Sequence, residues 1–439
     1  MRVLVVGGGG REHALVHSFA QSPHAERIFC APGNAGTDEI ADNIGVGSED
    51  LPALLEFASR EEVDLTVVGP EAPLVLGIAD LFEEHGLRVF GPSQAAAQLE
   101  GSKVFAKEVM GAGDVATGAY SRHETAASAA AHLAGARYPL VIKADGLAAG
   151  KGVLICNDAA EAEAAVEACF VAREFGDAGD VVIIEEYLTG SEVSLLVLCD
   201  GKSAVPLAPA QDYKRIFAGD KGPNTGGMGS YCPVPGFEDR AIDAAMEHVV
   251  EPVVAALRKR DIVYRGVLYA GLIATEAGVK VLEFNCRFGD PETQAVLPRL
   301  DSDLLELCAA ASAGELAGVK AAWKPRECVT VVMASAGYPA SSHKGDVITG
   351  LEAAGALDDV TVYHAGTALR DGDVVTAGGR VLAVSALGRG FAEARERAYE
   401  GVGRIIFDGA QIRADIAERA VRAAAGELSL FPHGLEGRR

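Results

Sequence analysis

The first twenty residues constrain the fold more than any other segment, because an aliphatic strand runs into a cluster of glycines and then into a helical pattern. Residues 3–6 are β-branched or aliphatic, Gly7 to Gly10 follow, and residues 11–20 have helical spacing. This order is typical of the first unit of a doubly wound α/β domain. Strands expected at 27–30, 65–68 and 88–90 alternate with helices expected at 51–59 and 77–85. The alternation predicts a parallel sheet.

The glycine turn leaves three interpretations open. A dinucleotide site needs the spacing G-x-G-x-x-G and an acid at the end of the next strand. Here Glu12 or His13 stands where the third glycine should be, and residues 29–32 contain no acid, so a full dinucleotide site is not favoured. A helix N-terminus behind glycines suits a single phosphate, because its free N–H groups and its dipole attract an anion. A tight turn without a ligand explains the same residues.

Length, charge and cysteine content narrow the class of protein. A chain of 439 residues forms about three or four compact units. The net charge of −23 argues against a large surface for nucleic acid or an anionic membrane, although a local basic pocket can still bind a small anion. No apolar run reaches about 18 residues and no secretory signal is recognisable, so we expect no membrane span. The eight cysteines lack C-x-x-C spacing and predict reduced, buried thiols in a cytoplasmic protein.

Changes in the pattern of expected helices and strands divide the chain into four parts. We expect an α/β domain over 1–100, a small α+β unit over 101–190, a larger α+β unit over 191–325 and a β-rich part over 326–439. The larger unit should contain a long amphipathic helix and a β-hairpin. The helix is expected at about 238–259, and the two strands of the hairpin at 266–274 and 278–285.

A glycine-rich turn at 145–153 lies between two expected strands and carries Lys151 between Gly150 and Gly152. It is not a Walker P-loop, because three residues instead of four separate Gly146 from Gly150, and glycine follows the lysine where Ser or Thr is needed. Such a loop could close over phosphates as a lid, with Lys143 on the preceding strand near the same phosphates. An ordinary β-turn that happens to carry a lysine is the alternative.

Two polar strand ends suggest further ligand contacts. The extended segment at 185–188 can offer backbone groups to an adenine edge, and a carboxylate a few residues later can hold ribose hydroxyls; a solvated strand end is the alternative. In the stretch 283–292, Glu283, Asn285 and Arg287 fall on one face of a strand by the period of two. Carboxylate and amide oxygens suit Mg²⁺, and the arginine could bind a carboxylate or a phosphate. An exposed polar edge is the alternative there.

These motifs, in this order, resemble the ATP-grasp superfamily and, within it, the phosphoribosylamine–glycine ligase family. The resemblance runs from Val3 to about the last 30 residues. Besides the 145–153 loop, its landmarks are GGGREHA at 8–14, PGNAGT at 32–37, GPEAPL at 69–74, LEGSK at 99–103, QDYKR at 211–215, NTGGMG at 224–229, EFNCRFGDPE at 283–292, GYP at 337–339, HAGT at 364–367 and GGRVL at 378–382.

The resemblance implies a fold and a set of roles. The fold would be an ATP-grasp fold of mixed α/β and α+β class, with a doubly wound N-terminal substrate domain, a small ATP lid, a central catalytic domain and a β-rich C-terminal domain. ATP would lie between the lid and the central domain. Its phosphate contacts would be Lys103, Lys143, Gly150, Lys151 and Gly152; its adenine contacts Glu185, Glu186 and Leu188; and its ribose contact Glu192.

The remaining roles also follow from the resemblance. The metal ligands would be Glu283 and Asn285, and the catalytic residues Lys143, Lys151, Asp212 and Arg287. The substrate-binding set would be Gly9, Gly10, Arg11, Glu71, Asp212, Lys214, Asn224, Thr225, Gly226, Gly227, Arg287 and Asp290.

Two positions depart from the expected pattern. The family usually has His where this chain has Tyr213, so proton transfer by that residue is not expected here. Some ATP-grasp enzymes carry an additional metal-binding acid about a dozen residues before the second, where this chain has Gly271 and Leu272. A second ion would therefore rest largely on ATP and water.

The resemblance implies ATP-dependent ligation of glycine to 5-phosphoribosylamine through a glycyl phosphate, with Mg²⁺ as the metal and Mn²⁺ as an alternative. A related ATP-grasp carboxylase of purine synthesis and a nucleotide-binding regulatory protein without turnover are the competing hypotheses. Segments 211–215 and 224–229 favour the ligase over the carboxylase, and the lysine and metal sets argue against a protein without turnover. We expect a cytoplasmic monomer that makes at most transient contacts with neighbouring purine-pathway enzymes.

Overall fold

The computed structural model describes residues 1–147 and 152–431. Its N-terminal sheet is parallel, in the order β3-β2-β1-β4-β5, as the alternating pattern predicts. The strands are β1 (Arg2–Gly7), β2 (Arg27–Pro32), β3 (Asp42–Asn43), β4 (Leu65–Val68) and β5 (Val89–Phe90). Helices α1 (Gly10–Ala20), α2 (Leu51–Arg60), α3 (Glu71–Leu76) and α4 (Ile78–Glu84) and the short turn η1 (Thr37–Glu39) connect them. Residues 3–6 are fully buried, as expected for a strand covered on both faces.

Two helices lead out of this domain. They are α5 (Gln94–Gly101) and α6 (Lys103–Ala112), and the side chains of Ser93 and Ser102 cap their N-termini. Helix α6 packs against the central hairpin strand β17 (Gly278–Asn285) and against α10 (Glu251–Arg258). Its lysines are therefore held against the central sheet.

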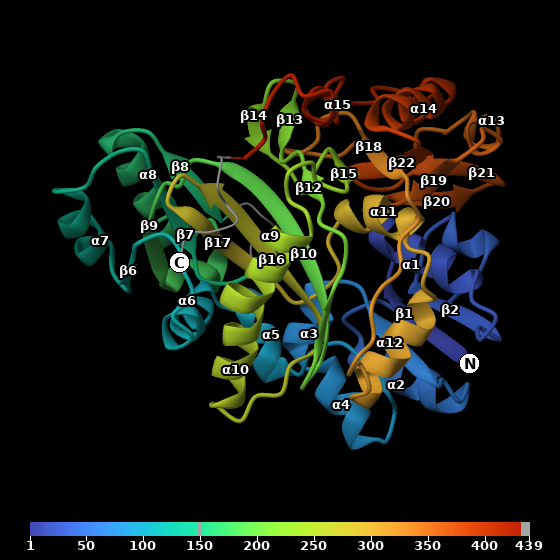
Figure 1. The fold of residues 1–439 in the computed structure, drawn as a ribbon, viewed down its shortest axis with the longest axis horizontal. Coiled ribbons are helices and arrows are strands. Elements are labelled where there is room, and N and C mark those ends of the chain that lie inside the picture. The colour runs from blue at the N-terminus through green and yellow to red at the C-terminus, as the bar shows by residue number, and fades with distance from the viewer. Residues whose placement is uncertain (148–151, 432–439) are drawn as a thin grey trace.

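A small antiparallel sheet of order β6-β9-β7-β8 forms a separate unit with its own core, on the left of Figure 1. Its strands are β6 (Tyr120–His123), β7 (Leu140–Ala144), β8 (Val153–Cys156) and β9 (Val182–Glu186). Helices α7 (Ala126–Leu133) and α8 (Ala159–Phe170) pack against each other beside it, and the turn η2 (Gly176–Asp180) precedes β9.

The central sheet is antiparallel, in the order β11-β10-β16-β17. The other strands are β10 (Ser191–Asp200), β11 (Ala204–Pro206) and β16 (Arg265–Thr275). The expected hairpin is present, with Thr275 opposite Gly278. The expected long helix is also present, as α9 (Asp239–Ala245), the π-helical turn η3 (Met246–Val250) and α10. A bulge interrupts the hairpin: Gly271 pairs with Glu283 and Leu272 with Val281, which leaves Leu282 as the extra residue.

The third large sheet has the order β12-β15-β18-β22-β19. Its strands are β12 (Gln211–Asp212), β15 (Gly229–Cys232), β18 (Glu327–Ala334), β19 (Val360–His364) and β22 (Arg380–Gly388). Two small hairpins accompany it: β13 (Arg215–Phe217) with β14 (Lys221–Asn224), and β20 (Thr367–Arg370) with β21 (Asp373–Thr376). Because β15 pairs with β18, a segment from the middle of the chain belongs to the same sheet as the C-terminal strands (Figure 1).

The remaining helices join or cover these sheets. They are α11 (Glu292–Val296), η4 (Leu297–Arg299), α12 (Leu304–Ala313), α13 (Leu351–Gly355), α14 (Phe391–Arg404) and α15 (Glu418–Ala424). No helix within the described residues is long and apolar enough to cross a membrane. All eight cysteines are buried and free, as the sequence predicts.

Buried histidines join the N-terminal helix α1 to the C-terminal strand β19. The backbone N–H of His364 donates to Nδ1 of His13 (2.8 Å), and the two rings lie 5.6 Å apart. Burial and, to a smaller extent, the neighbouring His364 and His17 lower the pKa of His13 to about 3. Burial also lowers the pKa of His364 to about 4. Both rings therefore stay neutral in the folded protein at pH values where the unfolded chain begins to protonate them.

We expect acid to destabilise the protein through this pair. A folded pKa below the ordinary 6.5 gives stability that is complete above pH 6.5 and is lost as the pH falls toward 4, at up to about 1.4 kcal/mol per pH unit for each ring. Urea denaturation between pH 7 and pH 5 at constant ionic strength measures the slope. His364→Gln should make the slope shallower, while exposed His85→Gln should not; equal slopes for all three proteins would contradict this account.

Candidate functional site

Three lysines from two elements converge near the start of the 145–153 loop. Lys143 on β7 forms an ion pair with Glu185 (2.8 Å) and donates to the carbonyl oxygen of Leu282 (3.2 Å), which the hairpin bulge leaves out of the strand pairing. Lys103 at the start of α6 donates to the carbonyl oxygen of Gly146 (2.9 Å). Two of the predicted phosphate contacts thus lie on the same side of the central hairpin, facing the entrance of the loop.

Sequence reasoning missed the third lysine. Lys107 lies one turn after Lys103 on α6, ion-pairs with Glu185 (3.0 Å) and donates to the hydroxyl of Thr117 (2.7 Å). Its side chain is only 3% exposed, so Glu185 is buried between two ammonium groups. The spacing of four residues from Lys103 was the available signal, because it places both lysines on one helix face. The partner of Lys107 could not be seen without the fold.

The segment predicted to hold adenine runs along the end of β9. The carboxylate of Glu185 faces Lys107 and Lys143, so only the backbone groups of Glu185 remain available to contact a base. Glu186 is exposed, receives the N–H of Ala119 on its carboxylate (3.3 Å) and pairs with Lys280 (3.4 Å). Leu188 is half-buried beside Gly118. Gly152 is buried, whereas the predicted residues Gly150 and Lys151 lie outside the described residues.

Glu283 and Asn285 lie on one face of β17, in regular pairing with Gly271 and Tyr269 beyond the bulge. Both side chains are half-buried. Glu283 forms no hydrogen bond or ion pair with any described residue, and the Oδ1 of Asn285 accepts one long bond from Arg287 (3.4 Å). Two oxygen-bearing groups with spare lone pairs on one strand face fit a hard divalent cation. Gly271 stands opposite Glu283, so no second carboxylate is present at that place in the hairpin.

An acidic cluster surrounds Lys214 beside this face. Lys214 contacts the carboxylates of Glu192 (2.9 Å) and Asp212 (3.4 Å). Burial raises the pKa of Asp212 to about 7, with Glu292 and Glu192 adding to the shift and Lys214 opposing it. For Lys214, burial lowers the pKa, but Asp212 and Glu192 outweigh burial and raise the pKa well above its usual value. Lys214 is thus a fixed cation, and Asp212 can exchange a proton near neutral pH.

Glu292 is a second residue to which the sequence assigned no role. Its carboxylate is buried and accepts hydrogen bonds from the hydroxyls of Tyr269 (2.8 Å) and Ser194 (3.0 Å). These two hydroxyls come from adjacent strands, β16 and β10. Glu292 therefore places a buried carboxylate near Asp212 and contributes to the raised pKa of that residue. Its place at the end of the 283–292 stretch was the signal that could have identified it.

Arg287 lies between two acids from the N-terminal part of the chain. It ion-pairs with Glu100 (2.9 Å) and Glu71 (3.4 Å), and its side chain is 18% exposed. Burial raises the pKa of Glu100, although Arg287 acts against this shift. The predicted substrate residues Glu71 and Arg287 are in contact, so the N-terminal domain and β17 meet at this arginine.

The glycine turn at the start of α1 is already capped by a carboxylate. Glu12 accepts the N–H of Gly9 (2.6 Å) and pairs with Arg11, which also donates to the carbonyl oxygen of Phe288 (3.2 Å). Burial raises the pKa of Asp290, but Arg380 and Arg11 outweigh it and leave the pKa low. Gly9, Arg11 and Asp290 thus lie close together. Because Glu12 occupies the Gly9 N–H, a phosphate would have to use other donors of this turn.

Tyr213 points away from the site. Successive residues of an extended segment alternate in direction, and its neighbours Asp212 and Lys214 face the acidic cluster. The Tyr213 ring lies between the guanidinium groups of Arg413 (4.7 Å) and Arg419 (4.5 Å), and its hydroxyl accepts the N–H of Ala417 (2.9 Å). The expectation that Tyr213 transfers no proton agrees with this geometry. The residue attaches the Asp212 segment to the C-terminal end of the described chain.

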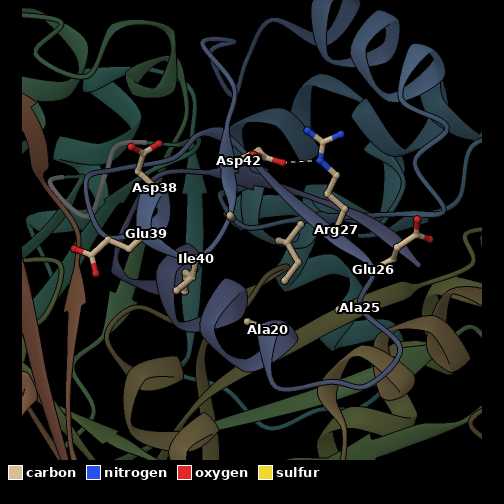
Figure 2. A pocket seen from close by; sticks show the side chains of 10 residues that line it. Ala20, Ala25, Glu26, Arg27, Asp38, Glu39, Ile40 and Asp42 are labelled. Atoms are coloured by element: carbon tan, nitrogen blue, oxygen red, sulfur yellow. Dashed lines mark hydrogen bonds and ion pairs between the residues drawn. The ribbon is translucent and has the colours of Figure 1, made fainter.

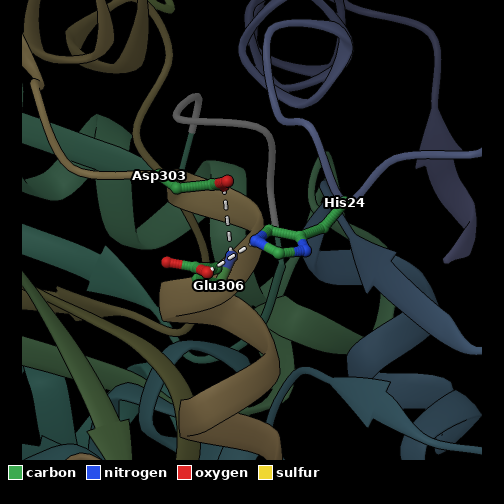
Figure 3. A group of neighbouring side chains, drawn as sticks. All are labelled: His24, Asp303 and Glu306. Atoms are coloured by element: carbon green, nitrogen blue, oxygen red, sulfur yellow. Dashed lines mark hydrogen bonds and ion pairs between the residues drawn. The ribbon is translucent and has the colours of Figure 1, made fainter.

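Two other features lie apart from this site. Figure 2 shows a groove of about 490 Å³ beside β2, in which Arg27 pairs with Asp42 and the other charged residues are acidic. In Figure 3, His24, Asp303 and Glu306 come close together, but Asp303 is the N-cap of α12: it accepts the N–H groups of Leu305 and Glu306 and the hydroxyl of Ser22. Its oxygens are occupied, which explains this cluster as a helix cap joined to the N-terminal domain.

Comparisons with known proteins cover nearly the whole chain. The sequence matches the phosphoribosylglycinamide synthetase N domain over residues 1–100, its ATP-grasp (A) domain over 101–293 and its C domain over 328–419. It is 49% identical over 417 residues to the phosphoribosylamine–glycine ligase of Caldanaerobacter subterraneus subsp. tengcongensis (95% of this chain, 99% of the relative). It is also 49% identical over 425 residues to the enzyme of that name from Escherichia coli O157:H7 (96% and 99%).

Solved structures give the same result at the level of the fold. The phosphoribosylamine–glycine ligase of Thermotoga maritima superposes with a TM-score of 0.83 at 32% identity, covering 94% of this chain and all of that one. A biotin carboxylase from Campylobacter jejuni, solved as a β,γ-ATP complex, has a TM-score of 0.71 at 15% identity over 94% of this chain and 92% of its own. This second likeness shows the fold alone, which is the ATP-grasp fold that the resemblance implies.

We expect Tyr213→Phe to lower stability and to spare activity. The substitution leaves the buried N–H of Ala417 without its acceptor, which costs about 1–3 kcal/mol of unfolding free energy. Urea denaturation measures the loss, with Tyr120→Phe as a control on an exposed ring. The specific activity of the folded protein should stay within about threefold of the wild type, because the hydroxyl faces away from Asp212 and Lys214. A drop of several orders of magnitude in a folded variant would mean that Tyr213 takes part in the chemistry.

Proposed function

The chain belongs to the phosphoribosylglycinamide synthetase family, and from this premise we propose how its residues divide the work of the reaction. The protein is an ATP-dependent ligase of purine biosynthesis, which joins glycine to 5-phosphoribosylamine and forms glycinamide ribonucleotide, ADP and phosphate. The observation that carries this function is the match of all three family domains, in order, at close to half identity over nearly the full length. Only a shared fold supports the alternative that the protein is a carboxylase.

We propose that the lysines of the site bind the phosphates of ATP. Lys103 donates to one protein acceptor and Lys143 contacts two, so each ammonium group, which has three N–H donors, retains at least one for a polyanion. Lys151 joins them on the strength of the sequence. Lys107 is proposed to hold Glu185, and thereby Lys143, in place. The base would lie along backbone groups near Glu186 and Leu188, with Glu192 at the ribose.

We propose that the acidic residues of the site bind the metal and the amino groups of the substrates. The family uses ATP with a divalent metal; we propose Mg²⁺, with Mn²⁺ as an alternative, on Glu283 and Asn285, whose hard oxygens suit it. When bound there, the ion neutralises charge on the phosphoryl group that is transferred. Arg287 would receive the glycine carboxylate, and Glu71, Asp290, Lys214 and the segment 224–227, together with Gly9, Gly10 and Arg11, would surround the aminosugar phosphate.

The chemistry then runs in two steps. A carboxylate oxygen of glycine attacks the γ-phosphorus of ATP, ADP leaves, and a glycyl phosphate forms. The amino nitrogen of phosphoribosylamine attacks the carbonyl carbon, and the bond to phosphate breaks. Asp212, with its pKa raised to about 7, is proposed to accept the proton from the attacking nitrogen. Positioning and charge neutralisation supply most of the acceleration.

The cellular setting is also a proposal. Eight buried, unpaired cysteines favour a reducing compartment, and we assign the enzyme to the cytoplasm. We also propose that the active unit is a monomer.

An oxygen-labelling experiment tests the function and the intermediate together. With glycine labelled by heavy oxygen in both carboxylate positions, we expect one labelled oxygen in the released phosphate and the other in the product amide. Phosphate release should require ATP, glycine and freshly made phosphoribosylamine, each omitted in turn. Release that depends on bicarbonate, or unlabelled phosphate from a glycine-dependent reaction, would contradict the ligase or the glycyl phosphate, respectively.

A substitution on β17 tests the metal assignment. Glu283→Gln keeps the size of the side chain and removes its charge, so we expect turnover to fall by about two orders of magnitude and the Mg²⁺ needed for half-maximal activity to rise. Glu276→Gln, at the exposed tip of the same hairpin, is the matched control and should behave as the wild type. A folded Glu283→Gln protein with wild-type activity at limiting Mg²⁺ would remove Glu283 from the metal site.

A further inference from the structure

Two side chains of the C-terminal part reach the proposed substrate segments. They are Arg380, the first residue of β22, and Tyr338, which follows β18. Both belong to motifs that sequence analysis noted without giving them a role, GGRVL and GYP. Both contact Gly226, in the middle of the segment 224–227.

Arg380 joins two segments that are 64 residues apart along the chain. Its Nη1 donates to the carbonyl oxygens of Gly226 and Asp290 (2.8 Å to the latter), and its Nη2 pairs with the Asp290 carboxylate (3.1 Å). The guanidinium is planar and rigid, so these contacts fix the distance between the segments as well as their charges. The Asp290 carboxylate also receives the side-chain N–H of Gln294 (2.8 Å), which leaves it little freedom to turn.

Tyr338 holds the other polar group of Gly226. Its hydroxyl accepts the N–H of Gly226 (2.9 Å). The Tyr338 ring can lie there because Gly379 has no side chain: a Cβ at that position would come within 2.5 Å of the ring. The second glycine of GGRVL therefore makes room for the tyrosine of GYP, and the arginine beside it reaches the same turn.

The backbone around Arg380 is fixed independently of the substrate segments. Its carbonyl oxygen accepts the N–H of Gly366 (2.9 Å), and it pairs with Ala334 at the end of β18. The turn at 224–227 is equally constrained, because Gly227 has a φ of +109° and lies against Pro291. Both sides of the contact are thus held by interactions within the protein.

We propose that Arg380 and Tyr338 are positioning residues for the two small substrates: they hold the segment 224–227 against Asp290, so that the backbone of this turn and the Asp290 carboxylate face glycine and the aminosugar phosphate in one arrangement. The inference rests on the proposed function. Neither side chain contacts Lys103, Lys107 or Lys143 or their partners, so the nucleotide side of the site does not depend on them.

Steady-state kinetics with each substrate varied in turn tests the proposal. In Arg380→Gln, the KM for glycine or for phosphoribosylamine should rise about tenfold or more, and the KM for ATP should stay within about twofold. Arg380→Lys keeps the charge but loses the two-pronged contact and should fall in between. Tyr338→Phe removes one acceptor and should raise the same KM about threefold.

The controls separate failure of this inference from failure of the proposed function. Arg389→Gln changes an arginine of the same domain whose side chain is 88% exposed, and its three KM values should equal those of the wild type. If wild type and this control release phosphate only with glycine, while Arg380→Gln and Tyr338→Phe leave the KM of both small substrates unchanged, the inference alone is overturned. An equal rise in the KM for ATP would also overturn it. Should Arg380→Gln fail to fold, the Tyr338→Phe result decides, because it removes one hydroxyl only.

Discussion

The ion pair between Arg287 and Glu100 is the contact on which the arrangement of the site depends. Glu100 lies near the end of α5, where the chain leaves the N-terminal domain, and Arg287 follows β17; their charged atoms are 2.9 Å apart. Glu100 also accepts the N–H of Cys286 (2.8 Å), so the acid holds both backbone and side chain at the end of β17. Removing one partner of a buried pair costs about 3–5 kcal/mol, far more than an exposed pair contributes. The pair thus fixes Glu283 and Asn285 relative to the N-terminal domain.

Most of the positive and most of the negative side chains of the site lie on different sides, and Glu283 is close enough to influence both Lys103 and Lys214. Lys103, Lys107 and Lys143 lie on the side of α6 and the small sheet, where Glu185 pairs with Lys107 and Lys143, and Glu283 is the acid that acts most strongly on Lys103. On the other side, Glu192 and Asp212 contact one ammonium group, that of Lys214, and Glu292 lies near Asp212. Such an excess of partly buried acid is costly without cations. A divalent ion and the amino groups of the two small substrates would relieve it, while the lysines favour the phosphates.

The sequence predicted those parts of the site that depend on local geometry. Alternation along a strand places Glu283 with Asn285, which the structure bears out. The parallel N-terminal sheet and the long helix followed from periodicity in the same way. Lys107 and Glu292 were missed because their roles come from partners on other elements, Glu185 on β9 and Tyr269 on β16. No local pattern encodes such a pairing, and the same holds for Arg380 and Gly226, which are 154 residues apart.

The topology of the third sheet gives the physical reason why the proposed substrate side of the site includes residues from the C-terminal part of the chain. Strand β12 carries Asp212 and pairs with β15, which pairs in turn with β18, whereas β17, which carries the proposed metal ligands, belongs to the central sheet. Asp212 and Glu283 therefore belong to different sheets, and Lys214, which feels both charges, lies between them. A site formed between two sheets needs contacts that hold each sheet in place. From the N-terminal domain, Glu100 and Glu71 pair with Arg287. From the C-terminal part, Arg413 and Arg419 lie against the ring of Tyr213. Arg380, also from the C-terminal part, pairs with Asp290. Each of these contacts includes an arginine, whose fixed geometry and permanent charge suit a junction that must keep its shape when the proposed ligands of opposite sign bind.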